Sequence, residues 1–163
     1  MIKAANRPRV VFDCNVLLQA AASDNGPSAK ALRLLEEGRI DVYLSRAVLK
    51  ELRNVMQYPS VRAKLPSLND KLIEQFINRL LFRGVLVHKV PHVFDLPRAK
   101  QDEPYIDLAS AAKADYLVSR DNDLLFLATD HSLIAKQFRR RFHSLHVLNP
   151  VAFLAALETP RSA

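Results

Sequence analysis

Short apolar runs alternate with amphipathic stretches along most of the chain. The clearest run is Val10-Val11-Phe12, which is rich in strand-favouring residues and ends directly at Asp13. A short apolar run between polar residues indicates a buried strand, and buried strands are typical of parallel sheets. Similar runs predict four further strands, at 40–44, 85–87, 116–118 and 145–148.

The segments between these runs carry apolar residues at helical spacing. Helices are predicted from the turn at 24–27 to Gly38, from a cap at Ser45 to Met56, from Asn69 to Gly84, over 104–114, and from Asn149-Pro150 onward. Residues 60–65 give no clear signal, 88–103 are predicted to be a loop, and 1–8 a polar lead-in. Strands that alternate with helices predict an α/β fold with a parallel sheet.

Composition limits the class of protein. A chain of 163 residues suits one domain, 1–163, and we see no repeat or second domain. No apolar run approaches the roughly 20 residues that span a bilayer, and the N-terminus lacks a signal peptide, so we expect a cytoplasmic protein without a membrane segment. The single cysteine, Cys14, excludes an internal disulfide and a cysteine-rich zinc site. A formal charge of +7 favours a polyanionic partner, nucleic acid above all.

Acidic residues recur where a sheet of this kind holds ligands. Asp13 follows the first predicted strand and Asp121 the fourth, and ligands of open α/β sheets bind at the carboxyl ends of strands. Glu51 borders the buried stripe of a predicted helix. Four further acids lie just before, within or after the segment leading to the fourth strand: Asp102, Glu103, Asp107 and Asp123.

Each acid also has a purely structural interpretation. Asp102 and Asp123 are suitable helix caps, and Glu51 could pair with a nearby lysine or arginine. As a set they are harder to explain in this way, because carboxylates about 5 Å apart repel by roughly 3 kcal/mol at an effective dielectric constant near 20. Protons or divalent cations relieve that repulsion.

An acidic cluster without histidine or cysteine ligands suits Mg²⁺ or Mn²⁺. Such a cluster serves phosphodiester hydrolysis, because the metal lowers the pKa of a water molecule and offsets charge on the leaving oxygen. A phosphotransferase of the haloacid dehalogenase type would need a second acid where this chain has Asn15. A response-regulator receiver would need a lysine after the last strand, where this chain has Leu148-Asn149-Pro150.

Three segments together carry a family resemblance: 13–17 after an apolar strand, Glu51-Leu52 in a predicted helix, and 114–125, in which Asp121 and Asp123 follow the predicted strand. From about Arg9 to Leu157 the chain resembles a PIN domain and, more narrowly, the toxin components of bacterial toxin–antitoxin systems. The resemblance implies a three-layer α/β/α fold whose five parallel strands follow the order 3-2-1-4-5. It also implies a metal-dependent endoribonuclease that forms a homodimer and binds a cognate antitoxin.

The resemblance assigns roles to individual residues. It gives as catalytic acids Asp13, Glu51, Glu103 and Asp121, and as metal ligands Asp13, Glu103 and Asp121. Asp102, Asp107 and Asp123 compete for the metal-binding role, because Glu103 stands where the family usually has aspartate. Asn15 would orient Asp13, and Ser119 would lie near the metal. Cys14 stands where the family usually has threonine, and we expect it to pack as a small buried thiol.

Basic residues gather late in the chain. They are Lys136, Arg139, Arg140 and Arg141, with Arg120 closer to the acids. The cluster 136–141 is either a solvated helix face or a contact with the RNA backbone. The alternative to an enzyme is a PIN-like module that binds RNA or protein and has an impaired metal site. The sequence contains no identifiable reader of the 2′-hydroxyl that would separate RNA from DNA.

Overall fold

The computed structural model describes residues 6–158, so most of the predicted lead-in lies outside the described residues. Five strands form one parallel sheet in the order β3-β2-β1-β4-β5, as the resemblance implied. The strands are β1 (Arg9–Phe12), β2 (Asp41–Leu44), β3 (Val85–Leu86), β4 (Tyr116–Val118) and β5 (His146–Leu148). The predicted α/β class and strand order are confirmed.

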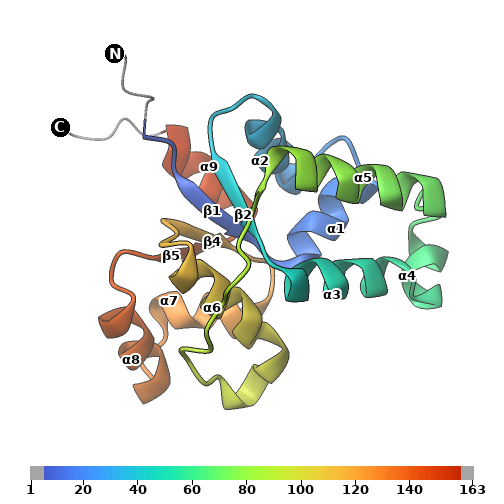
Figure 1. Ribbon diagram of the computed structural model, residues 1–163. Coiled ribbons are helices and arrows are strands. Elements are labelled where there is room, and N and C mark those ends of the chain that lie inside the picture. The colour runs from blue at the N-terminus through green and yellow to red at the C-terminus, as the bar shows by residue number, and fades with distance from the viewer. Residues whose placement is uncertain (1–5, 159–163) are drawn as a thin grey trace.

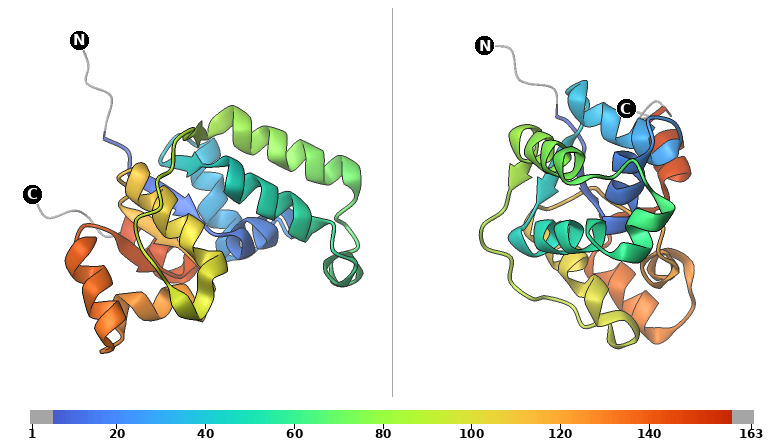
Figure 2. Two further views of the ribbon diagram at one scale, coloured as in Figure 1. Left: turned by 60° about the horizontal axis from the view of Figure 1, so that its bottom comes forward. Right: turned by 90° about the vertical axis from the view of Figure 1, so that its right-hand side faces the viewer.

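Helices cover both faces of this sheet. They are α1 (Cys14–Ala22), α2 (Pro27–Glu36), α3 (Arg46–Met56), α4 (Pro59–Lys64), α5 (Asp70–Arg83), the 3₁₀ helix η1 (Pro97–Asp102), α6 (Glu103–Ala111), α7 (Asn122–Thr129), α8 (Leu133–Arg141) and α9 (Pro150–Glu158). Helices α5 and α6 lie in front of the sheet in Figure 1, and α2 and α9 lie behind it. The side view in Figure 2 shows the same separation, with the sheet between the two layers of helices.

The central strand β1 organises the core. Val10, Val11 and Phe12 are almost completely buried, and the ring of Phe12 packs edge-on against Phe153 of α9 at 6.0 Å. β1 pairs with β2 on one side and with β4 on the other. Because the chain changes sides of β1 between β3 and β4, the carboxyl ends of β1 and β4 form the topological switch point, where open α/β sheets bind ligands.

Side-chain caps begin several of the helices, as the sequence indicates. Ser45 accepts from the backbone N–H of Val48, and Asn149 accepts from that of Ala152. Gly38, which follows α2, has a φ of +71°, the left-handed conformation that favours glycine at a helix end.

Other boundaries differ from the sequence-based expectations. Helix α1 was not predicted, because it follows β1 without an intervening turn. Helix α4 occupies the segment that gave no clear signal; it buries none of its residues and therefore leaves no amphipathic pattern. The end of the predicted loop 88–103 forms η1, and α6 spans 103–111, whereas 104–114 was predicted. Within residues 6–158, no helix is both long and apolar enough to cross a bilayer.

Candidate metal centre

Asp13 is fixed at the carboxyl end of β1 by three hydrogen bonds. Its side chain caps α1 by accepting from the backbone N–H of Val16 at 3.0 Å, and its other oxygen accepts from the Ser119 hydroxyl. The backbone N–H of Arg120 also donates to it. Asp13 is 3% exposed, and this burial raises the pKa of its carboxyl although the hydrogen bonds act in the opposite direction.

Ser119 connects the acid of β1 to the acid that follows β4. Phe12, the last residue of β1, pairs with Val118, the last residue of β4. The residues that follow them, Asp13 and Ser119, are therefore neighbours at the edge of the sheet. The fully buried Ser119 hydroxyl donates to Asp13 and accepts from the backbone N–H of Asp121 at 2.9 Å. Asp121 in turn caps α7, accepting from the backbone N–H of Asp123. Asp123 is therefore not the cap of this helix.

Asp102 lies at the junction of η1 and α6, and its carboxyl is 6% exposed. It occupies the cap position of α6 but makes no side-chain cap; its carboxyl instead shares a hydrogen bond with that of Asp121. Burial raises the pKa of Asp102 to about 8, and the hydrogen bond with Asp121 and the negative charges of Asp121, Asp13 and Asp123 act in the same direction.

One oxygen of this carboxyl, Asp102 Oδ2, is buried without a hydrogen-bond partner among the described residues. A buried polar atom without a partner costs roughly 1–3 kcal/mol, and native proteins contain few of them. An oxygen of Asp102, one of Asp121 and one of Asp123 all lie within 4.8 Å of one another. Carboxylates at that separation repel by about 3 kcal/mol at an effective dielectric constant near 20.

This group of oxygen atoms fits a hard divalent cation. Its donors are carboxylates alone, which is the ligand chemistry of Mg²⁺ and Mn²⁺ and not that of zinc. A cation there would remove the repulsion and would satisfy the unpartnered oxygen of Asp102.

Glu51 of α3 approaches Asp13 from another side. Its carboxylate accepts from the Tyr105 hydroxyl at 2.9 Å, and within residues 6–158 it forms no ion pair with a lysine or arginine, the pairing considered from the sequence. Burial raises the pKa of Cys14 to about 12, and the charges of Glu51 and Asp13 add to the effect. The two carboxylates therefore both lie close to Cys14, which is buried as expected and has no ionised thiol at neutral pH.

Arg98 of η1 is a neighbour of the acids that sequence reasoning did not find. Its Nε donates to Asp123 Oδ1 at 2.9 Å and a terminal nitrogen lies 2.8 Å from the same oxygen. The guanidinium also lies over the ring of Phe126, 4.1 Å from its centre. No sequence signal marks this arginine, because it lies in a segment that was predicted to be a loop.

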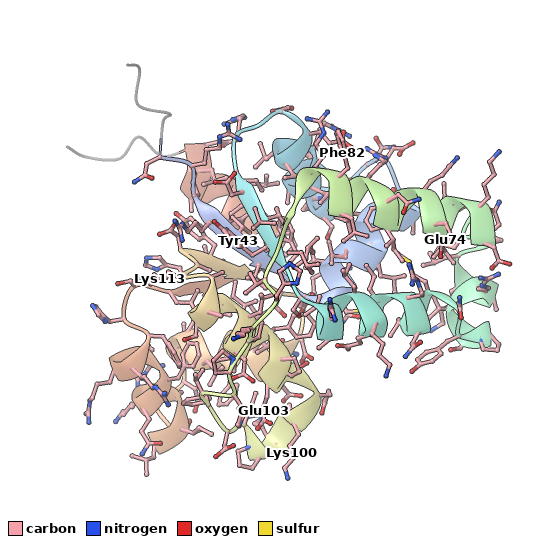
Figure 3. All side chains as sticks on the ribbon, viewed as in Figure 1. Tyr43, Glu74, Phe82, Lys100, Glu103 and Lys113 are labelled. Carbon is pink, nitrogen blue, oxygen red and sulfur yellow. The ribbon has the colours of Figure 1, made fainter. Side chains whose placement is uncertain are left out.

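Glu103 and Asp107 face a different part of the chain. Glu103 accepts from the backbone N–H of Leu96 at 2.6 Å, and Asp107 accepts from that of Val93 at 2.8 Å. His92 bridges Asp107 and Asp95, and these two hydrogen bonds raise its pKa to about 9. Figure 3 shows Glu103 at the start of α6. These side chains hold the 92–96 segment against α6.

Asn15 and the basic residues complete the predicted set. Asn15 is exposed, and no hydrogen bond in the described structure joins it to Asp13. Arg139 donates to the backbone carbonyls of Leu127 and Asp130, and Arg141 donates to that of Val93. Three exposed cations, Arg120, Lys136 and Arg140, form no side-chain hydrogen bond or ion pair with any residue between 6 and 158.

Comparison with known proteins agrees with this architecture. The chain is similar to an uncharacterized protein of Methanocaldococcus jannaschii, MJ1680, with 28% identity over 126 residues that cover 77% of this chain and 79% of the relative. The PIN domain family matches residues 9–123, a range that contains β1 to β4 and all the acids described above. The family match covers more than half of the chain, so the chain belongs to the PIN domain family.

Proposed function

We propose that this protein is a metal-dependent endoribonuclease that hydrolyses RNA phosphodiester bonds at the acidic cluster around Asp13. PIN domains are in general nucleases, and the acidic group at the switch point could hold a metal ion. The observation that carries the proposal is the unpartnered, buried oxygen of Asp102 beside Asp121 and Asp123. No residue between 6 and 158 offers a group that satisfies this oxygen.

In this proposal four acids hold the cation: Asp102, Asp121 and Asp123, whose oxygens lie within 4.8 Å of one another, and Asp13. Asp102 thus takes the role that the resemblance assigned to Glu103, because the Glu103 carboxylate is engaged by the Leu96 backbone. A bound Mg²⁺ or Mn²⁺ supplies the activation of water and the neutralisation of the leaving oxygen. Because the pKa of Asp102 is raised to about 8, a cation at this carboxylate would compete with a proton.

Glu51 is a further catalytic acid of the proposal. The Tyr105 hydroxyl orients its carboxylate, and its distance from Asp13 is short enough for both charges to act on Cys14. A carboxylate held in this way is suited to accept a proton from an attacking water molecule. Ser119 and the α1 backbone position Asp13 and do not touch the substrate.

The charge distribution supports RNA as substrate. The net charge of +7 favours a polyanion. Arg120, Lys136 and Arg140 are exposed and pair with no residue between 6 and 158, so they are available for phosphate groups. Arg139 and Arg141 are bound to backbone carbonyls, so we assign them a structural role. A role as a cytoplasmic toxin, with a cognate antitoxin and a homodimeric form, extends the proposal and depends on the sequence resemblance alone.

A nuclease assay tests the proposal directly. Single-stranded and structured RNA are incubated with the protein and Mg²⁺, Mn²⁺ or a chelator, beside the Asp121→Asn variant. We expect cleavage with either metal, no cleavage with the chelator, and none by the variant. Mn²⁺ should also raise the melting temperature of the parent but not of the variant, because a ligand that binds only the folded state stabilises it. RNA binding without cleavage and without this rise would instead show a binding module with an impaired metal site.

A further inference from the structure

A cavity of about 360 Å³ adjoins the candidate metal centre. Arg120 lines it and lies in the chain between Ser119 and Asp121, so the cavity and the candidate metal centre are built from adjacent residues of the same segment. Asn149 also lines it and directly follows β5. The cavity therefore opens at the carboxyl edge of the sheet, like the metal centre.

The wall of this cavity combines four kinds of side chain with one glycine, Gly26. They are four apolar residues, three amides, one guanidinium and one hydroxyl: Pro27, Leu125, Pro150 and Val151, then Gln19, Asn25 and Asn149, then Arg120, then Ser28. Mostly apolar walls with a few polar groups are typical of small-ligand sites. The ligand must therefore offer flat apolar surface, hydrogen-bonding edges and a negative charge.

Three polar side chains of the wall are not used by the described part of the fold. The side chains of Gln19, Asn25 and Arg120 make no hydrogen bond or ion pair with the rest of the described chain. Asn149 uses its side-chain oxygen to cap α9, which leaves its amide nitrogen available. Val151 is 62% exposed, so this apolar residue of the wall is open to a ligand.

A nucleotide matches this combination. A nucleobase has two apolar faces and an edge of donors and acceptors, which amide side chains read well, and its phosphate pairs with arginine. The base must be unpaired, because only unstacked bases of RNA present their faces and edges to a protein pocket.

A second, larger cavity lies between α1, α2 and α5, and acids in its wall make it less suited to a nucleotide. Its volume is about 480 Å³, and its wall includes the acids Asp24 and Glu36. Glu36 pairs there with Arg79, so this cation is already neutralised. Carboxylates at the wall repel phosphate, whereas no acid lines the cavity beside Arg120.

We propose that the cavity lined by Arg120 binds one unpaired nucleotide of the RNA strand, next to the bond that is cleaved. Gln19 and Asn25 read the edge of the base, and Arg120 binds its phosphate. This inference rests on the proposed function for the position of the cut, but the binding itself can be measured without cleavage.

The experiment measures the affinity of the full chain for labelled hexaribonucleotides of each of the four bases, by fluorescence anisotropy in the presence of a chelator. Val151→Glu places a negative charge at the mouth of the cavity. We expect it to weaken binding about tenfold, because stacking and phosphate contacts are lost. Gln19→Ala combined with Asn25→Ala should reduce the differences in affinity among the four bases.

Each variant has a matched control. Leu133→Glu makes the same charge change at another exposed apolar residue in the first turn of a helix, and should leave the affinity nearly unchanged. Gln75→Ala with Asn78→Ala removes two amides from the larger cavity and should leave the base preference unchanged. Circular dichroism verifies that all variants fold.

The outcomes separate this inference from the proposed function. Equal loss of affinity in Val151→Glu and Leu133→Glu, or an unchanged affinity in both, would overturn the nucleotide site even if the parent cleaves RNA. A cavity-dependent affinity in a protein that never cleaves would uphold the site and refute the nuclease. A parent that binds none of the four oligonucleotides refutes the nucleotide site outright.

Discussion

The structure contains two groups of acids a few residues apart in sequence, and they differ in what surrounds them. Asp95, Glu103 and Asp107 receive hydrogen bonds from His92 and from backbone N–H groups. Asp102 and Asp121 share a hydrogen bond with each other, and one oxygen of Asp102 has no partner in the described structure. The carboxylates of the first group accept hydrogen bonds from the protein. The second group includes a buried oxygen that the described residues leave without a partner, and a ligand could bind it.

This difference shows that the proximity of carboxylates does not by itself define a metal centre. His92, Asp95 and Glu103 also offer ligand atoms within 4.8 Å of one another. Their hydrogen bonds explain that arrangement as a structural clasp between the 92–96 segment and α6. A metal site is indicated where acids lie together and a buried carboxylate oxygen remains unsatisfied, which holds for Asp102 beside Asp121 and Asp123.

The largest effect should separate two neighbouring residues, Asp102 and Glu103. Asp102→Asn should lower RNA cleavage at least about 100-fold and abolish the Mn²⁺-induced rise in melting temperature, because a ligand carboxylate is lost. Glu103→Gln should keep cleavage close to that of the parent, since an amide oxygen can still accept from Leu96. Cleavage rates and melting curves of both variants decide the matter. A larger loss of cleavage in Glu103→Gln than in Asp102→Asn would assign the metal-binding role to Glu103 instead of Asp102.

The second largest effect should be a pH dependence of stability that Asp102 causes. The pKa of Asp102 is raised from an ordinary 3.8 to about 8, so between these values the folded state holds a proton that the unfolded state has released. Stability of the metal-free protein should therefore fall as pH rises from about 4 to about 8. Thermal melts in chelator should show this slope in the parent and a shallower one in Asp102→Asn. Parallel slopes would contradict the assignment.

Arg98 should have an intermediate effect through the orientation of Asp123. Arg98→Met removes two close nitrogen contacts, and residues that orient metal ligands typically contribute about 10–100-fold to metal affinity. We expect Mn²⁺ titrations followed by melting temperature to show about tenfold weaker binding. Lys100→Met, an exposed cation of the same 3₁₀ helix, serves as control. Tighter Mn²⁺ binding by Arg98→Met would mean that the arginine competes with the metal.

The smallest effect should come from the group of acids around His92. Hydrogen bonds to Asp95 and Asp107 raise the pKa of His92 to about 9 from an ordinary 6.5. Its contribution to stability is fully present below about pH 6.5 and is lost as pH rises through about 9. His92→Gln should therefore melt below the parent at pH 6, match it above pH 10, and cleave RNA at an unchanged rate. A loss of cleavage at neutral pH would make the clasp part of the active site.

Much of the architecture could be predicted from local sequence. The apolar run before Asp13 predicts the central strand, and the alternation of strands and helices predicts the parallel sheet that the structure confirms. The same pattern places Asp13 and Asp121 each after a strand, whereas the pairing of these two strands was implied only by the resemblance to PIN domains. The strands, the helices and the acids that follow the strands each depend on residues close together in the chain. A local sequence pattern can therefore predict them.

The choice among Asp102, Glu103 and Asp107 could not be predicted in the same way. Adjacent residues at the start of a helix point in directions about 100° apart, and the direction depends on where the helix begins. The partners that engage Glu103 and Asp107 come from the 92–96 segment, which has no regular pattern. Arg98 was missed for the same reason, since its contacts with Asp123 and Phe126 are long-range.

The acids of the metal centre are attached to the fold in two ways. Asp13 and Asp121 follow neighbouring strands whose spacing is set by the hydrogen bonds of the sheet. Asp102 ends a 3₁₀ helix in which Ala99 departs from helical backbone angles, with φ of −155° and ψ of 68°. Insertions or deletions in the connection before Pro97 can therefore reposition Asp102 while Asp13 and Asp121 remain fixed. Sequence changes in this connection can thus alter the distances between the metal-binding acids while the sheet stays the same.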